Sequence, residues 1–279
     1  MAIWMMAAFL GAILVACPPG AMAQAPQPAE VDDKQGVKVG SPSFVRKLVP
    51  AETLETAALQ QYGALKKEAT TKGALLPPNH PQNVRLRRIA RDLLPHAHKW
   101  NPRAKDWKWE VVLINSGNIN AFCMPGGKIA FFTGILDKLK LTDDEVAMVM
   151  GHEIAHALRE HARERMAKQT LTNIGAIAVN VLVGGNAGEL ARIGGGLLGL
   201  KFSRDDEREA DLVGMELAAR AGYDPRSGVT LWEKMSAASQ GQPLEWFSTH
   251  PSGKSRIDTI KANLKDVLPL YEAAKVKRG

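Results

Sequence analysis

The feature that most constrains this chain is the stretch Gly151–His156, with the sequence GHEIAH. On a helix, His152 and His156 stand one turn apart on the same face, so both imidazoles can reach a single metal ion. Glu153 lies beside the first histidine, where it can accept a proton from a water molecule on that metal. The spacing therefore predicts a helix that carries a metal-hydrolase site.

The flanking residues predict where this helix begins and where it leaves the core. Thr142 and Glu145 have the spacing of a capping box, with Thr142 as the N-cap. The apolar residues 146–150 then direct the helix into the protein. Residues 159–165 are polar on every side, so we expect this end of the helix to lie in solvent. The alternative is a solvated helix that carries two histidines by chance, which is expected in roughly one chain in a hundred.

A third metal ligand is expected from a second helix over residues 203–220. Glu207 and Asp211 lie four residues apart on one face of it. Glu207 would complete a set of two histidines and one carboxylate, and Asp211 would hold a ligand histidine through its other ring nitrogen. Glu209 and Glu216 lie on the opposite face and are expected to be solvated. The alternative is a charged first turn favoured by the helix dipole, which leaves the spacing of the two carboxylates unexplained.

Four motifs together resemble a known family of zinc metallopeptidases. They are His-Glu-x-x-His at 152–156, Ser-Arg-x-x-Glu-x-Glu-Ala-Asp at 203–211, Asn-Ala-Phe at 120–122 with Pro-Gly-Gly at 125–127, and Thr-His-Pro at 249–251 with Arg-Ile at 256–257. The family is metallopeptidase family 48, of the gluzincin type, which includes HtpX, the CAAX prenyl protease and bacterial periplasmic relatives. The resemblance covers most of the chain after its N-terminal segment.

The resemblance implies an α+β, predominantly helical fold, with a zincin-like metallopeptidase domain. It further implies one Zn²⁺ held by His152, His156 and Glu207, with Glu153 as the catalytic base. A histidine near the end of the family's domain can approach the metal or the developing oxyanion, and this role maps to His250. The alternative for His250 is a histidine held in place for packing.

A small antiparallel sheet is expected before the metal helix. Residues 107–114 and 128–133 are expected strands, with a short strand at Asn120, Ala121 and Phe122 between them. In zinc peptidases of this type, an edge strand holds an extended substrate by backbone hydrogen bonds. These three residues are the candidates for that role, and ordinary core sheet is the alternative.

The resemblance implies a zinc-dependent endopeptidase that acts on unfolded or misassembled cell-envelope proteins. Arg256 is a candidate for stabilising the oxyanion, with a pair to Asp258 as the alternative. Two other functions stay open. A latent metal-binding chaperone or scaffold would have no need for the base Glu153. A zinc hydrolase of a non-protein envelope amide would have no need for a strand that pairs with peptides.

Composition limits the partners. The net charge of +7 is spread along the chain, and no aromatic-basic stacking pattern suggests nucleic acid. Contact with an anionic membrane surface is compatible with this charge. Cys123 is expected to be a small buried hydrophobe rather than a nucleophile.

The N-terminus is expected to be a targeting segment. Residues 1–23 read as a signal peptide cleaved after Ala23, although no Lys or Arg precedes the apolar run. The alternative is a lipoprotein signal over 1–16 with a lipidated Cys17. The first places the mature protein in the periplasm, and the second anchors it to the outer membrane. A flexible leader at 24–40 and a single metallopeptidase domain at 41–279 would follow.

The stretch 171–200 is rich in Gly and Ala and includes several polar residues. Because it has no uninterrupted apolar run of about 20 residues, a transmembrane hairpin is disfavoured. We expect two short helices that form a lid over the site or contact a membrane surface.

Overall fold

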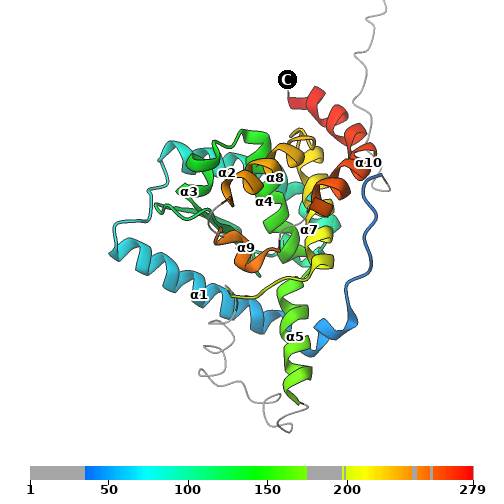
Figure 1. The fold of residues 1–279 in the computed structure, drawn as a ribbon. Helices are drawn as coiled ribbons and strands as arrows, with labels where there is room; N and C mark the ends of the chain where they lie inside the picture. The colour runs from blue at the N-terminus through cyan, green and yellow to red at the C-terminus, as the bar shows by residue number, and fades with distance from the viewer. Residues whose placement is uncertain (1–34, 175–196, 198, 241–243, 252–253, 279) are drawn as a thin grey trace, which may run out of the picture.

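The computed structural model of the chain describes residues 35–174, 197, 199–240, 244–251 and 254–278. In this part of the chain, helices surround a small three-stranded sheet (Figure 1), which confirms the expected α+β, predominantly helical class. The predictions for the targeting segment, for most of the leader and for most of 171–200 lie outside the described residues. The described helices include none with both the length and the apolar character of a membrane span. The single domain over 41–279 stays a prediction.

The elements follow in this order: the 3-10 helix η1 (Phe44–Leu48), α1 (Ala51–Thr71), α2 (Pro81–Leu93), the 3-10 helices η2 (Leu94–Lys99) and η3 (Pro102–Lys105), β1 (Glu110–Ile114), β2 (Ala121–Met124), β3 (Lys128–Phe132), α3 (Thr133–Leu139), α4 (Asp143–Leu158), α5 (His161–Ile174), α7 (Arg204–Arg220), α8 (Ser227–Ala238), α9 (Trp246–Thr249) and α10 (Lys254–Arg278).

The sheet is mixed, so the expectation of an antiparallel sheet was wrong for one of its two pairings. Its strand order is β1-β3-β2, with β2 antiparallel and β1 parallel to β3. Gly126 and Gly127 adopt positive φ angles in the turn after β2, which sends β3 back between the other two strands. A side chain at Gly127 would also clash, because its Cβ would lie 2.7 Å from the ring of Trp109. The turn therefore leaves β2 at one edge of the sheet.

Apolar residues cover both faces of the sheet. Val111 and Leu113 of β1 belong to the main core, which is shared with α2, α4 and α7. Val112 and Ile114 point to the other face and pack with residues of α1. Tyr62 of α1 is fully buried there, and its hydroxyl donates a hydrogen bond to the Ile129 carbonyl at 2.9 Å. Burial on both faces explains why β1 reads as a continuous apolar run.

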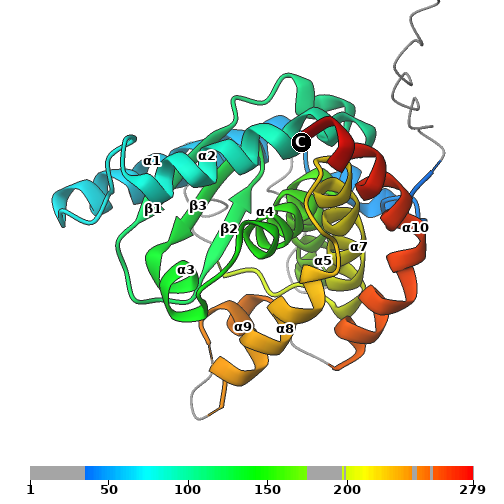
Figure 2. The same cartoon turned by 90° about the horizontal axis from the view of Figure 1, so that it is seen from above.

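Helix α4 lies between the edge strand β2 and helix α7 (Figure 2). Two glycines permit the close approach of α4 to α7. A Cβ at Gly151 would lie 2.7 Å from the Gly214 carbonyl oxygen, and a Cβ at Gly214 would lie 2.5 Å from the His152 nitrogen. This contact brings together the two helices that carry the candidate metal ligands His152, His156 and Glu207.

The polar stretch after the first motif does not continue α4 into solvent, contrary to the sequence-based expectation. The helix ends at Leu158, Glu160 adopts a φ of 57°, and α5 begins at His161. Both Arg159 and His161 are buried. Their polar groups face Glu209 of α7, so a charged partner from a distant segment compensates for their removal from water.

Candidate active site

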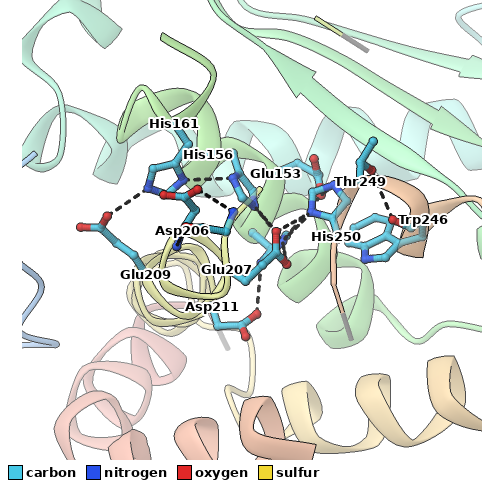
Figure 3. A network of polar contacts seen from close by, with 12 residues as sticks. Glu153, His156, His161, Asp206, Glu207, Glu209, Asp211, Trp246, Thr249 and His250 are labelled. Carbon is cyan, nitrogen blue, oxygen red and sulfur yellow. Dashed lines mark hydrogen bonds and ion pairs between the residues drawn. The ribbon is translucent and has the colours of Figure 1, made fainter. Parts of the chain in front are cut away.

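Four side chains converge at the junction of α4, α7 and α9. His152 and His156 come from α4, Glu207 from the first turns of α7, and His250 from the residue after α9. Each offers one ligand atom, and these atoms all lie within 4.8 Å of one another. All four side chains are buried, and Figure 3 shows His156, Glu207 and His250 pointing toward one another.

Local sequence fixes how these helices begin. Thr142 and Glu145 form the expected capping box of α4, with both reciprocal hydrogen bonds present. Ser203 caps α7 in the same way, with Asp206 as its partner. The caps satisfy amide groups that would otherwise lack partners, and they set the helical phase that turns both motifs toward the same point.

The distances within the cluster suit shared coordination of one ion. The Nε2 atoms of His152 and His156 lie 3.1 Å apart. The Glu207 carboxylate reaches both rings, with Oε1 at 3.3 Å from His156 Nε2 and Oε2 at 3.6 Å from His152 Nε2. His250 Nδ1 lies 3.0 Å from Glu207 Oε1.

The pKa shifts of these groups are those that metal ligands require. Burial lowers the pKa of both His152 and His156, so their rings stay neutral and keep a lone pair for a metal. Burial alone would raise the pKa of Glu207, but His156, His250 and Arg256 outweigh it and hold that pKa far below its usual range. Two neutral imidazoles and one carboxylate form a donor set that fits a divalent ion such as zinc.

Asp211 and Arg256 contact the candidate ligands His152 and Glu207 on the side away from the cluster centre. Asp211 Oδ1 lies 3.1 Å from His152 Nδ1, the ring nitrogen that faces away from the ligand cluster. Arg256 donates two hydrogen bonds of 2.6 Å to the Asp211 carboxylate and a further one to Glu207. Its guanidinium also stacks 3.7 Å from the centre of the Trp232 ring. Arg256 thus pairs with Asp211 and Glu207 and not with Asp258, the alternative partner considered from the sequence.

Glu153 lies beside the cluster with an unusual electrostatic environment. Its carboxyl is buried, and its Oε1 atom has no hydrogen-bond partner among the described residues. Burial is the main cause that raises the pKa of Glu153, His250 and Arg256 oppose the shift, Glu207 adds to it, and the resulting pKa is about 7. A carboxyl with a pKa near neutrality can both accept and return a proton at physiological pH.

The pKa of His250 is shifted in the opposite sense to those of the other two histidines. Burial lowers it, but the neighbouring carboxylates of Glu153 and Glu207 outweigh burial and raise it above its ordinary value. His250 Nε2 lies 3.7 Å from Glu153 Oε1. The ring is therefore suited to donate a hydrogen bond beside Glu153.

The candidate substrate-binding residues lie at the edge of the sheet, next to helix α4. Ala121 and Phe122 belong to β2, the edge strand that packs next to α4, and Asn120 immediately precedes it. A small cavity of about 30 Å³ opens nearby, bounded by mainly apolar groups that include Leu54, Cys123, His156 and Phe202. Cys123 is itself buried, which agrees with the hydrophobic role expected for it.

Sequence spacing missed two groups next to the cluster. His161 lies outside the His-Glu-x-x-His motif, yet its Nδ1 atom lies 3.0 Å from His156 Nδ1. Glu209 was expected in solvent, but it pairs with His161 and with Arg159. The solvated position expected for Glu216 was also wrong, since its buried carboxylate pairs with Arg220 and Lys99. Arg220 lies one turn after Glu216 on α7, so helical spacing allows that pair, whereas Lys99, Arg159 and His161 come from other segments that no periodicity within α7 could reveal.

Comparisons with known proteins agree with this geometry. Residues 81–264 match the model of Peptidase family M48. The chain is 39% identical over 185 residues to mitochondrial metalloendopeptidase OMA1 of Arabidopsis thaliana, which covers 65% of this chain and 37% of the relative. It is 28% identical over 199 residues to the metalloprotease LoiP of Escherichia coli, covering 70% and 75%. It is 29% identical over 170 residues to the beta-barrel assembly-enhancing protease of E. coli, covering 57% and 35%.

The matched regions span 37% to 61% of the length of three OMA1 relatives from plants and yeasts. The family match, in contrast, covers well over half of this chain and includes both metal-binding motifs and His250. The resemblance noted from the four motifs is thereby confirmed, and the chain belongs to Peptidase family M48.

Proposed function

We propose that this chain is a zinc-dependent endopeptidase in which His152, His156 and Glu207 hold one Zn²⁺. One observation carries the proposal. Two neutral imidazoles and an ionised carboxylate converge beside Glu153, whose buried Oε1 atom has no hydrogen-bond partner among the described residues. Zinc peptidases need this combination of three protein ligands and one adjacent base.

An ion held by His152, His156 and Glu207 would supply Lewis-acid chemistry and would lower the pKa of a coordinated water toward neutrality. Glu153 accepts a proton from the attacking water and later delivers it to the amine that leaves. Its pKa of about 7 supports both steps. His250, with a raised pKa, donates a hydrogen bond to the oxygen of the peptide carbonyl as negative charge develops there.

Asp211 and Arg256 support this chemistry indirectly. Asp211 fixes the ring of His152, and Arg256 binds the carboxylates of Asp211 and Glu207 together. Because the Arg256 guanidinium is engaged by both carboxylates, we assign it a positioning role in place of direct oxyanion stabilisation.

The substrate is proposed to bind as an extended strand along Asn120, Ala121 and Phe122. An edge strand offers backbone groups that pair with any peptide, so the sequence preference would be broad. The apolar cavity beside His156 and Cys123 would accept a small apolar side chain near the scissile bond. Extended peptides of this kind are available in unfolded proteins, which are the substrates we propose.

We place these substrates in the cell envelope. The N-terminal segment predicts export to the periplasm, with a lipid anchor at Cys17 as the alternative. The E. coli relative named for enhancing β-barrel assembly supports substrates among misassembled envelope proteins. The positive net charge is compatible with contact at an anionic membrane surface.

The test is cleavage of an unfolded outer-membrane protein by the purified, zinc-loaded mature chain. Glu153→Gln should lower the rate by about 10²–10⁴-fold, because it removes the base while it preserves the shape of the side chain. The matched control is Glu233→Gln, at an exposed position on α8, which should leave the rate unchanged. If neither wild type nor control cuts although both bind one zinc, the chaperone function is favoured. Cleavage of a cell-wall amide alone would favour the non-protein hydrolase.

A further inference from the structure

A line of buried polar contacts leads from the proposed metal ligand His156 away from the metal. His156 Nδ1 faces His161 Nδ1 at 3.0 Å, and His161 Nε2 faces Glu209 Oε2 at 3.0 Å (Figure 3). Arg159 Nη2 lies 2.5 Å from Glu209 Oε1 and donates to the carbonyl of Gly40 in the N-terminal segment. The line joins α4, α5, α7 and the segment before α1.

The directions of the hydrogen bonds along this line follow from the metal site. A histidine that binds a metal through Nε2 must carry its proton on Nδ1. His156 therefore donates from Nδ1, and the facing Nδ1 atom of His161 must be the acceptor. The proton of His161 then lies on Nε2, where it is donated to the carboxylate of Glu209. Each donor in the line meets one acceptor.

We propose that His161 is a positioning residue that orients His156 for zinc through this fixed tautomer. The inference rests on the proposed function, because it takes His156 as a ligand. A partner on the distal nitrogen of a ligand histidine fixes the ring orientation and makes the ring more basic. Asp211 does this for His152, and His161 does it for His156 with Glu209 as the terminal anion.

The surrounding structure holds the His161 side chain in one place. The side chain is 2% exposed, and Glu160 before it adopts a left-handed φ of 57° that ends α4 and starts α5. Phe202 packs on the same two rings, with its centre 4.0 Å from that of His156 and 6.3 Å from that of His161. A histidine present only to fill space would not need both of its nitrogens to meet partners.

The test compares two substitutions by the affinity for zinc, measured by competition with a chromophoric chelator. His161→Phe preserves a planar ring but removes the acceptor, so zinc should bind about 10–100-fold more weakly. His161→Asn places an amide oxygen near the former Nδ1 atom and should recover most of that loss. The control His98→Phe removes an exposed histidine on η2 and should not change the affinity. A folded His161→Phe with wild-type zinc affinity would overturn the proposal.

A second measurement needs no variant to fold. In nitrogen-15 NMR spectra of the zinc-loaded wild type, His161 should be protonated on Nε2 and His156 on Nδ1. A proton on Nδ1 of His161 would contradict the inferred line of hydrogen bonds. Failure of the wild type to bind zinc would refute the proposed function and this role together, whereas unchanged affinity in the variants would refute only the role of His161.

Discussion

The contact between α4 and α7 offers a sharp test of how the site is assembled. The proposed ligands come from both helices, and Gly151 and Gly214 allow the two backbones to touch. Gly214→Ala adds a single methyl group at this contact. The substitution therefore probes whether close approach of two backbones is a condition for the metal site.

The expected magnitude follows from the distances. The new Cβ at position 214 would lie 2.5 Å from the His152 nitrogen and 2.7 Å from the Gly151 carbonyl carbon. Carbon atoms in contact prefer about 3.5–4.0 Å, so the helices would need to separate by about 1 Å. Overpacking costs about 1–3 kcal/mol, and rigid backbone neighbours place this case at the upper end. Alanine gains about 1 kcal/mol over glycine in helix propensity, which leaves a net loss of about 2 kcal/mol.

The assay is urea unfolding with a chelator present, followed by zinc titration of the folded variant. Gly63→Ala is the matched control, because a Cβ at that exposed position on α1 meets nothing within 4 Å. The control should gain about 0.5–1 kcal/mol from helix propensity alone. Gly214→Ala should lose stability and bind zinc more weakly. If Gly214→Ala instead gains as much stability as the control, the reasoning about this contact is refuted.

Three further predictions concern residues outside the metal cluster. Burial alone would raise the pKa of Glu145, but hydrogen bonds from Lys234 and from the helix cap hold it below its ordinary value of 4.5. Its carboxylate thus stabilises the fold above that pH, and the contribution is lost as the pH falls through the lowered pKa. In urea unfolding, Glu145→Gln should lose less stability than wild type as the pH falls from 7 through the lowered pKa of Glu145, below 4.5, and equal losses would contradict this. Burial raises the pKa of the Cys123 thiol well above its usual value, so a thiol reagent should label it only after unfolding, and rapid labelling of the native chain would oppose this. Glu216→Gln should cost about 2–4 kcal/mol in urea unfolding, because it leaves Arg220 buried without its anionic partner, and a cost under about 0.5 kcal/mol would disagree.

The metal-binding helices could be inferred from sequence because their signals are local. A spacing of four residues places His152 and His156 on one face of any α-helix, whatever surrounds it. The capping boxes at Thr142 and Ser203 likewise depend on atoms within a few residues. The helices that carry the candidate ligands followed from such short-range rules, whereas the class of the fold was implied by the family resemblance.

The topology of the sheet needed information that the sequence pattern does not contain. The sequence pattern predicted three strands in an antiparallel sheet, but not their order in the sheet or the parallel pairing of β1 with β3. Strand β3 inserts between β1 and β2 and runs parallel to β1. Pairing order depends on how the helices cover the two faces, which is a property of the whole core.

The partners of the charged residues were decided only by the tertiary structure. Glu209 and Glu216 lie on the face of α7 that looks solvated by helical spacing, yet Glu209 meets Arg159 and Glu216 meets Lys99, both from distant segments. His161 lies five residues after His156, outside the four-residue spacing of the motif, and its contact with His156 is seen only in the folded structure. A periodic pattern reports which residues share a face, whereas the burial of a charge depends on whether another segment supplies its counter-ion. The sequence alone thus determined the ligands expected on each helix, and only the packed structure determined what holds those ligands in place.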